Sequence, residues 1–407
     1  MQDSPSTHDS NSAGGESARV RGVLNGLLAD CVRQDASDLH LAPELPPYYR
    51  IHGVLGPTEN LVPVSAAELE LLARELAREC RLTALGQIGS LDGALTAADG
   101  TRFRFNVFRR QGRMSIALRR LEDRFRSLAD LGLPTSLYDL CDLPDGLVLV
   151  AGPTGAGKST TLATLIDRIN RNRRCHIVTI EDPIEYLHAP LMSLVNQRQV
   201  GMDTESFNEA LVASLRQDPD VILVGEIRDL ATIRTAITAA ETGHLVFTTV
   251  HAGDCVGTIE RLVSVFPADE QAGVRRQIAL VLKAIVAQHL IVADGTANRP
   301  SGQDSNNGGQ PTATRRSRVV TSEIMIANPA VANLIATAKG NQIYSSMETG
   351  GHLGMQTLEE DLARLWAANQ ISETTAMTMA RNPQIVRERA ANLRGNGASP
   401  YLRKAVR

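Results

Sequence analysis

The stretch that decides the fold is a glycine-rich loop, Gly152-Pro153-Thr154-Gly155-Ala156-Gly157-Lys158-Ser159. It matches the pattern G-x-x-x-x-G-K-[ST] in full, follows the apolar segment Leu147–Ala151 and opens a helical run. Glycines let backbone N–H groups converge on phosphates, and the helix beginning near Lys158 directs its positive dipole end at them. By chance the pattern would occur in about one chain in seventy of this length. We therefore predict a P-loop in which Lys158 contacts the outer phosphates of ATP and Ser159 holds Mg²⁺.

Apolar segments around this loop set the fold of its domain. Four of them alternate with helical patterns: Leu147–Ala151, His176–Ile180, Val221–Val224 and Leu245–Val250. Such alternation is typical of an α/β fold with a mainly parallel sheet. We therefore predict a P-loop α/β domain at residues 135–386. Within it, residues 294–317 are polar and rich in Gly, Asn, Ser and Thr, which predicts a flexible insert between two strands.

The residues before this domain have a different pattern, which predicts a second and smaller domain. Ser65–Cys80 has the spacing of an amphipathic helix, and the residues after it alternate between apolar and polar. Asp99-Gly100 and Gln111-Gly112 are turn signals between the predicted strands. We predict a small mixed α+β domain at 18–122, followed by a linker at 123–134.

Composition and charge exclude several classes of protein. The 407 residues carry a net charge of -3 and only 3% are aromatic, so stacking platforms for nucleic acid are not expected. The five cysteines contain no C-x-x-C pair, which argues against a zinc site or disulfide framework and favours the cytosol. The most apolar stretch, Ile278–Ala293, is interrupted by polar residues and falls short of the ~18 residues needed to span a bilayer. We expect any membrane association to be peripheral.

Both ends of the chain are expected to be tails. Residues 1–17 are rich in Ser, Asp, Asn and Gly and lack the basic flank and apolar core of a signal peptide. Residues 387–407 carry six basic residues against one glutamate, with glycine and proline that break helices. We interpret the basic end as a solvated tail.

Two acidic motifs follow the P-loop. Asp220-Val221-Ile222-Leu223-Val224-Gly225-Glu226 is a buried strand that ends on a carboxylate, as a Walker B strand does beside the metal. Before it, three carboxylates crowd Thr179–Tyr186 at a predicted strand end, the edge where ligands bind in open α/β sheets. Each motif alone is commonplace, but downstream of a P-loop Glu226 becomes the metal candidate. His244 and His251 flank the next strand, and His251 at its end could sense the γ-phosphate.

The order of these motifs resembles the secretion ATPase superfamily, and most closely the PilT-like retraction ATPases of type IV pili. The resemblance covers about residues 36–384 and rests on six stretches: Asp35–Leu41, Gly152–Thr161, Thr179–Tyr186, Asp218–Asp229, Ala240–His251 and Gln342–Leu358. It implies a PAS-like small α+β domain followed by a RecA-like ATPase domain.

The resemblance also implies roles for single residues. Its Asp box falls on Thr179–Tyr186, and the last carboxylate, Glu185, is the group that activates the attacking water. Its Walker B glutamate falls on Glu226 and its His box spans His244–His251. Its charge-stabilising arginines in the smaller domain fall on Arg104 and Arg119, which suits a site that closes during phosphoryl transfer. Thr160 and His244 are expected to contact the nucleotide, together with the P-loop.

The partners are likewise implied by the resemblance. It implies a homohexameric ring in which the smaller domain moves relative to the ATPase domain and drives pilus retraction. The ring would act on an inner-membrane platform protein and the pilus machinery from the cytoplasmic face. No nucleic acid partner is expected.

Two features bear on the direction of work. The missing C-x-x-C pair argues against assembly and secretion ATPases of the GspE or PilB kind. However, the family stretch AIRNLIRE, associated with retraction, lacks its charged members at Ala330–Thr337. An assembly or secretion motor stays open as an alternative, as does a regulatory ring that binds nucleotide without hydrolysing it. Intact Lys158, Glu185 and Glu226 argue against the second.

Overall fold

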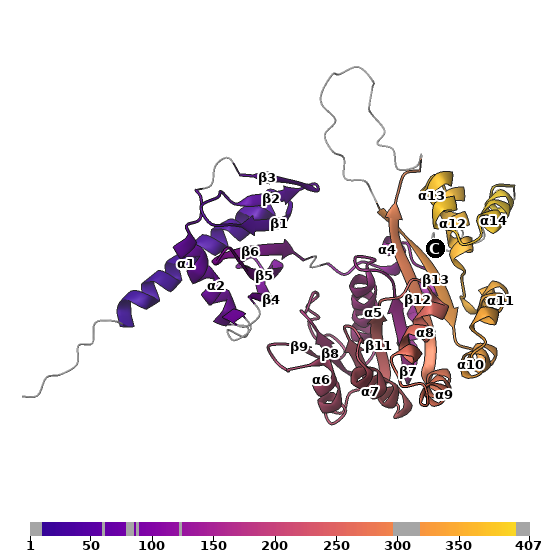
Figure 1. Cartoon of the computed structure of the whole chain (residues 1–407). Helices are drawn as coiled ribbons and strands as arrows, with labels where there is room; N and C mark the ends of the chain where they lie inside the picture. Colours follow the sequence, from indigo (N-terminus) through magenta and orange to yellow (C-terminus); the bar gives the residue numbers. More distant parts are fainter. Residues whose placement is uncertain are drawn as a thin grey trace, which may run out of the picture.

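The computed structural model describes residues 10–58, 62–78, 85–86, 89–121, 124–295 and 318–395, with side chains from residue 19 onward. Figure 1 shows an N-terminal domain built on one sheet and a C-terminal domain built on a second sheet. This two-domain α/β architecture confirms the predicted fold class.

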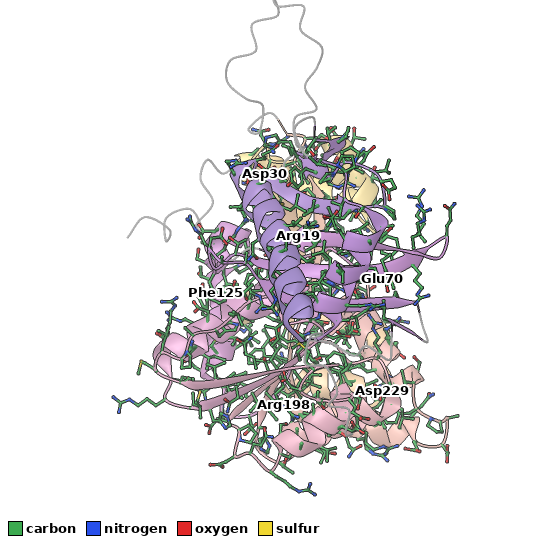
Figure 2. The ribbon with its side chains drawn as sticks, turned by 90° about the vertical axis from the view of Figure 1, so that its left-hand side faces the viewer. Arg19, Asp30, Glu70, Phe125, Arg198 and Asp229 are labelled. Carbon is green, nitrogen blue, oxygen red and sulfur yellow. The ribbon has the colours of Figure 1, made fainter. Side chains whose placement is uncertain are left out.

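The N-terminal domain is a six-stranded antiparallel sheet in the order β3-β2-β1-β6-β5-β4, covered by two helices. Its elements are α1 (Ser10–Arg33), β1 (Ala36–Leu41), β2 (Tyr48–Ile51), β3 (Val54–Pro57), α2 (Ala66–Arg78), β4 (Ser90–Thr96), β5 (Arg102–Arg110) and β6 (Arg113–Arg120). Figure 2 shows α1, which carries Arg19 and Asp30, lying across the sheet. The alternation in β5 buries Phe103, Phe105 and Val107 against this layer, as its period of two predicts.

The β5–β6 hairpin turns at the dipeptide that the sequence singled out. Gln111 has φ 51° and Gly112 φ 76°, so both central residues are in the left-handed region. A two-residue turn of this kind matches the right-handed twist of the flanking strands. The turn thereby fixes the register that places Arg104 opposite Arg119.

The C-terminal domain contains a seven-stranded sheet in the order β13-β12-β7-β11-β10-β8-β9, parallel except for β13. Its strands are β7 (Gly146–Ala151), β8 (His176–Glu181), β9 (Leu194–Gln199), β10 (Val221–Val224), β11 (Leu245–Val250), β12 (Leu282–Val292) and β13 (Arg318–Ile326). Every residue of β7, β10 and β11 is buried, because helices cover both faces of the sheet. All four strands predicted from the apolar segments are present.

Helices form the outer layers of this domain. They are α4 (Leu128–Leu131), η1 (Thr135–Asp142), α5 (Lys158–Asn172), α6 (Phe207–Ser214), α7 (Leu230–Glu241), α8 (Cys255–Ser264), α9 (Gln271–Val281), α10 (Pro329–Ala336), η3 (Gly340–Gln342), α11 (Ile343–Thr349), η4 (Gly351–Leu353), α12 (Leu358–Ala367), α13 (Glu373–Met379) and α14 (Pro383–Gly395). Alternate residues of β7 face two separate cores, one with α7, α8 and α9 and the other with η1 and α5. Helices α10 to α14 lie beside β13 (Figure 1).

The ends of the domains differ from the expected boundaries. Helix α1 begins at Ser10, so residues 10–17 are helical although we expected a tail. Helix α14 continues to Gly395 and buries Ala390 against α12, so the first part of the expected basic tail is packed. Its charged residues lie on the exposed face of an amphipathic helix, which the charge count alone did not reveal.

The expected linker also ends earlier than predicted. Ser127 caps α4 with a complete capping box, and Leu128 and Leu133 are buried in the core beside α5. Its second half therefore belongs to the C-terminal domain. Residues 1–9, 396–407 and most of the expected insert, 296–317, lie outside the described residues.

No helix in the described part of the chain is long and apolar enough to cross a bilayer.

Candidate nucleotide site

The P-loop connects the buried strand β7 to helix α5. Gly152 has φ +148°, and a Cβ there would lie 2.4 Å from the carbonyl oxygen of Gln288, so only glycine fits. Gly157, with φ 89°, is the N-cap residue of α5. The Gln288 side chain is fully buried in β12, donates to the Ala156 carbonyl (2.7 Å) and accepts from the Thr161 hydroxyl (2.9 Å). Through these two hydrogen bonds, Gln288 stabilises the loop from strand β12.

Lys158 lies at the first position of α5 with its ammonium directed into the loop. Its Nζ donates to the carbonyls of Gly152 and Pro153, both at 3.0 Å. Burial lowers the pKa of Lys158, whereas the carboxylates of Glu226 and Glu185 raise it. Those two carboxylates come from different motifs, so this cation lies within the electrostatic reach of both.

The remaining P-loop side chains differ in exposure. Pro153, Thr154, Gly155 and Ser159 are exposed and Ala156 is buried. The Thr160 hydroxyl lies 3.1 Å from the hydroxyl of Tyr186, which ties the first turn of α5 to the end of the Asp box.

The carboxyl ends of four parallel strands lie along one edge of the sheet. Ala151 pairs with Val250 and Val224 pairs with Ile180, so the residues after β7, β8, β10 and β11 meet there. The P-loop, the Asp box, Glu226 and His251 are these residues. This convergence is the arrangement that the sequence motifs predicted.

Glu226 and His251 contact each other at this edge. The Glu226 Oε2 atom lies 2.7 Å from the Arg228 guanidinium and 3.5 Å from Nε2 of His251. Burial and the Lys158 ammonium lower the pKa of His251, while Glu226 raises it. Upstream, the Gly225 carbonyl accepts from the Thr249 hydroxyl at 2.7 Å, which fixes the backbone before Glu226.

His244 does not join this edge. It precedes β11 at its amino end, where the His244 carbonyl accepts from the Gly146 amide and Nδ1 lies 3.0 Å from the Ala239 carbonyl. The six residues of β11 put it roughly 20 Å from the carboxyl edge. Within one chain, His244 therefore lies at the opposite end of β11 from the P-loop and His251, and its contact with the nucleotide stays a prediction.

The three carboxylates of the Asp box occupy different environments. Glu181 accepts hydrogen bonds from Thr179 (2.7 Å) and Gln197 (3.1 Å), and burial raises its pKa. Burial also raises the pKa of Asp182, and the Arg104 guanidinium opposes that rise. Of the three, Glu185 lines the cavity described next.

This cavity, of about 720 Å³, lies between the two domains. The N-terminal domain contributes Arg119 and Arg120, and the C-terminal domain contributes Gly157, Thr160 and Glu185. Five arginines line it against two carboxylates: Arg119, Arg120, Arg126, Arg318 and Arg364 against Asp130 and Glu185. Its volume suits a small-molecule ligand, and its positive charge beside a helix N-terminus suits a polyphosphate. Lys158, Ser159, Glu226 and His251 are not among its lining residues.

The two predicted arginines share one face of the N-terminal sheet. Arg104 on β5 and Arg119 on β6 are directly paired in the ladder, so their side chains project to the same side. Arg104 forms an ion pair with Asp92 at 3.7 Å, and Arg119 with Asp38 at 2.9 Å.

Arg102 makes the contact between domains that the sequence did not single out. Its guanidinium, on β5, donates to the carbonyl of Ile184 at 2.7 Å. Ile184 immediately precedes Glu185, so this bond anchors the Asp box to the smaller domain. The alternation in β5 predicts that Arg102 lies on the exposed face of the sheet. Its partner Ile184 is 82 residues away in the sequence, and only the packing of the two domains brings the two residues together.

His188, at the end of the Asp box loop, is buried and gives the loop a pH dependence. Its ring stacks on Phe125, labelled in Figure 2, with centroids 4.7 Å apart, and only 6% of the residue is exposed. Burial lowers the pKa of His188 from 6.5 to about 4. Between these values the unfolded chain binds a proton that the folded chain does not.

We therefore expect stability to be complete above pH 6.5 and to fall as the pH drops toward 4. Each pKa unit corresponds to about 1.4 kcal/mol, so the free energy of unfolding should decrease by up to about 3 kcal/mol. Urea denaturation across this range measures the change. His188→Gln should flatten the profile, and the exposed-site control His352→Gln should not; equal slopes in all three proteins would contradict the assignment.

Comparison with known proteins identifies the family. The family model for the Type II/IV secretion system protein matches residues 14–370. The chain is 42% identical over 361 residues to the type IV pilus retractation ATPase PilT of Pseudomonas aeruginosa, covering 89% of this chain and 99% of that protein. It is 39% identical over 338 residues to a twitching motility protein of Neisseria gonorrhoeae, covering 83% and 85%. A solved structure, the pilus retraction motor PilT with bound ADP, has a TM-score of 0.78 and 38% identity and covers 89% and 98%. The chain therefore belongs to the type II/IV secretion system protein family and is a PilT-like secretion ATPase.

Proposed function

We propose that this chain hydrolyses ATP with Mg²⁺ and uses the energy to retract type IV pili. The observation that carries the proposal is the convergence of the P-loop, the Asp box and Glu226 at one sheet edge. A cavity beside that edge is lined by arginines of the smaller domain. The names of the two relatives, retraction ATPase and twitching motility protein, support the same function.

The nucleotide would lie with its phosphates on the P-loop. The non-proline residues of 152–157 would provide backbone N–H groups and Lys158 its ammonium, and Thr160, in the first turn of α5, would contact the nucleotide from the same helix end. The Ser159 hydroxyl and the Glu226 carboxylate are oxygen donors of the kind that Mg²⁺ prefers. When bound, Mg²⁺ would neutralise charge on the β- and γ-phosphates.

Glu185 is the proposed general base. Its carboxylate would accept a proton from the water that attacks the γ-phosphorus, as the bond to the leaving ADP oxygen breaks. Arg104 and Arg119 would stabilise the charge that spreads over the transferred phosphoryl group when the domains close. His251, whose Nε2 lies 3.5 Å from the Glu226 carboxylate and which is close to Lys158, would respond to the presence of the γ-phosphate.

The proposed assembly is a homohexamer that acts on an inner-membrane platform protein and the pilus machinery. Because hydrolysis would occur where domains meet, movement of the smaller domain is the proposed source of mechanical work. The chain is 42% identical to the retraction ATPase over 99% of that protein. This similarity favours retraction, from the cytoplasmic face of the inner membrane, over assembly.

Metal dependence tests the chemistry. We expect purified protein to release phosphate from ATP when Mg²⁺ is present. Excess EDTA should lower this rate by at least about 100-fold. A metal that stabilises transition-state charge supplies several kcal/mol, which accounts for this size of effect. Added Mg²⁺ should restore the rate. Turnover that EDTA leaves unchanged would contradict the proposed roles of Ser159 and Glu226.

A further inference from the structure

The stretch Asp35–Leu41 belongs to the family pattern but has no role in the site described above. Its residues Ala36–Leu41 form β1, which runs antiparallel to β6. In this ladder Asp38 is the direct partner of Arg119. Since paired residues project to the same face, the carboxylate and the guanidinium meet on the side of the sheet that carries the proposed charge-stabilising arginines.

Asp38 is buried, with only 7% of the residue exposed. It accepts from Nε of Arg119 at 2.9 Å and from the Ser37 hydroxyl at 2.7 Å, and Nε of Arg50 lies 3.5 Å away. A buried carboxylate held in this way has little freedom to move. It is therefore a fixed point against which a longer side chain can be oriented.

Asp38 holds one edge of the Arg119 guanidinium, the edge that carries Nε. The Arg119 side chain is 68% exposed, and within the described residues its one hydrogen bond runs from Nε to Asp38. The two terminal nitrogens of the guanidinium are left for another acceptor, and Arg119 lines the cationic cavity beside Glu185. An arginine side chain has many rotamers, so holding Arg119 in place in advance lowers the entropic cost of ordering it when phosphate binds.

The neighbouring residues repeat this arrangement. Asp35, just before β1, accepts from the guanidinium of Arg120 at 2.6 Å, and Arg120 also lines the cavity. Two consecutive arginines at the end of β6 are thus each held by an acidic residue of the same short stretch. If Asp35 and Asp38 served only to join β1 to β6, their two arginine partners would not both need to line the cavity.

We propose that Asp38 is a positioning residue that orients the Arg119 guanidinium toward the nucleotide phosphates. The inference rests on the proposed function for the role of Arg119. It assigns to the Asp35–Leu41 stretch a task in catalysis, exerted through Arg119 and without contact to the nucleotide.

A double-mutant cycle tests the proposal. We expect Asp38→Asn to lower kcat about tenfold with a smaller change in KM, and Arg119→Gln to lower it at least as much. The double variant should resemble Arg119→Gln alone, because Asp38 then has nothing to orient. If Asp38→Asn lowers kcat by the same factor in both backgrounds, the proposal is wrong.

Two further variants separate positioning from folding. Arg50→Gln removes the other cationic partner of Asp38 and should leave kcat within about twofold; a loss equal to that of Asp38→Asn would show a structural role. Arg119→Lys changes an exposed side chain, so the variant should fold normally. Lysine has no Nε–H group and so cannot make the hydrogen bond by which Asp38 holds the arginine. This variant should reproduce the loss in kcat seen with Asp38→Asn, and normal turnover would overturn the proposal.

The affinity of the same variants for a fluorescent ATP analogue gives a second readout of the cycle, and this readout does not depend on ATP hydrolysis. If wild-type protein does not hydrolyse ATP, the proposed function fails. Non-additive losses of affinity in the cycle would still support the positioning role, and additive losses would refute it. Hydrolysis that Arg119→Gln leaves unchanged would overturn the positioning role while the ATPase function stands.

Discussion

Replacement of Glu185 by glutamine is expected to lower ATP hydrolysis by about 100-fold or more while nucleotide binding is retained. The amide keeps the size of the side chain in the cavity but cannot accept a proton from water, and general-base catalysis contributes ~10²–10⁴-fold. Glu185 is the Asp box carboxylate that lines the cavity, beside Thr160 and Gly157 of the P-loop. Steady-state phosphate release, with binding of a fluorescent ATP analogue measured in parallel, gives both quantities.

Glu181→Gln is the matched control for this substitution. Glu181 belongs to the same motif, but its carboxylate is held by Thr179 and Gln197 and does not line the cavity. Burial raises its pKa, so a neutral amide is a mild replacement. We expect this variant to keep most of the activity. If Glu181→Gln is inactive and Glu185→Gln is active, Glu185 is not the base.

Lys158→Ala is expected to weaken nucleotide binding strongly. Hydrogen bonds to charged groups contribute ~1.5–3 kcal/mol each, so losing the ammonium should weaken affinity for an ATP analogue by about 10- to 150-fold. The loop should also lose order, because Lys158 donates to the carbonyls of Gly152 and Pro153. Titration with the fluorescent analogue measures the affinity.

The control for Lys158 is Lys283→Ala. Lys283 lies on β12 and pairs with Asp145 at 3.0 Å, outside the P-loop and the cavity lining. Its removal should leave the affinity within about twofold, as expected for a partly exposed ion pair. Equal losses in the two variants would indicate a general effect of charge on binding and would refute the specific role of Lys158.

Much of the C-terminal fold could be predicted because its strands are local apolar runs between helices. The P-loop fixed where one strand ends and one helix begins, and parallel pairing then places the other motifs at the same edge. This logic predicted that Glu226 and His251 lie at that edge, whereas the choice of Glu185 among the Asp box carboxylates came from the family resemblance; the catalytic roles of all three stay predictions. In the N-terminal domain, the turn at Gln111-Gly112 determined the register of β5 and β6.

The features that could not be predicted depend on contacts between distant residues. Gln288 braces the P-loop from a strand 132 residues away from Ala156, and nothing in its local sequence signals that role. Arg102 reaches Ile184 only because the two domains pack together. His244 is the opposite case, since the resemblance placed it with His251 in one His box, whereas strand β11 separates the two side chains within the chain.

Chain ends were also hard to predict from composition. The basic residues after Arg387 indicated a tail, yet Ala390 packs against α12 and keeps the helix in place to Gly395. Val386 and Ala390 are buried and lie four residues apart, which is a helical spacing that the charge count alone did not reveal. Packing of this face against α12 stabilises the helix.

Deletion of the gene in its host, followed by counting of surface pili, tests the central claim most directly. The account predicts excess pili and loss of surface motility, both reversed by the wild-type gene and not by the Glu185→Gln variant. Loss of pili would indicate an assembly motor, and unchanged piliation would contradict a pilus motor of either direction.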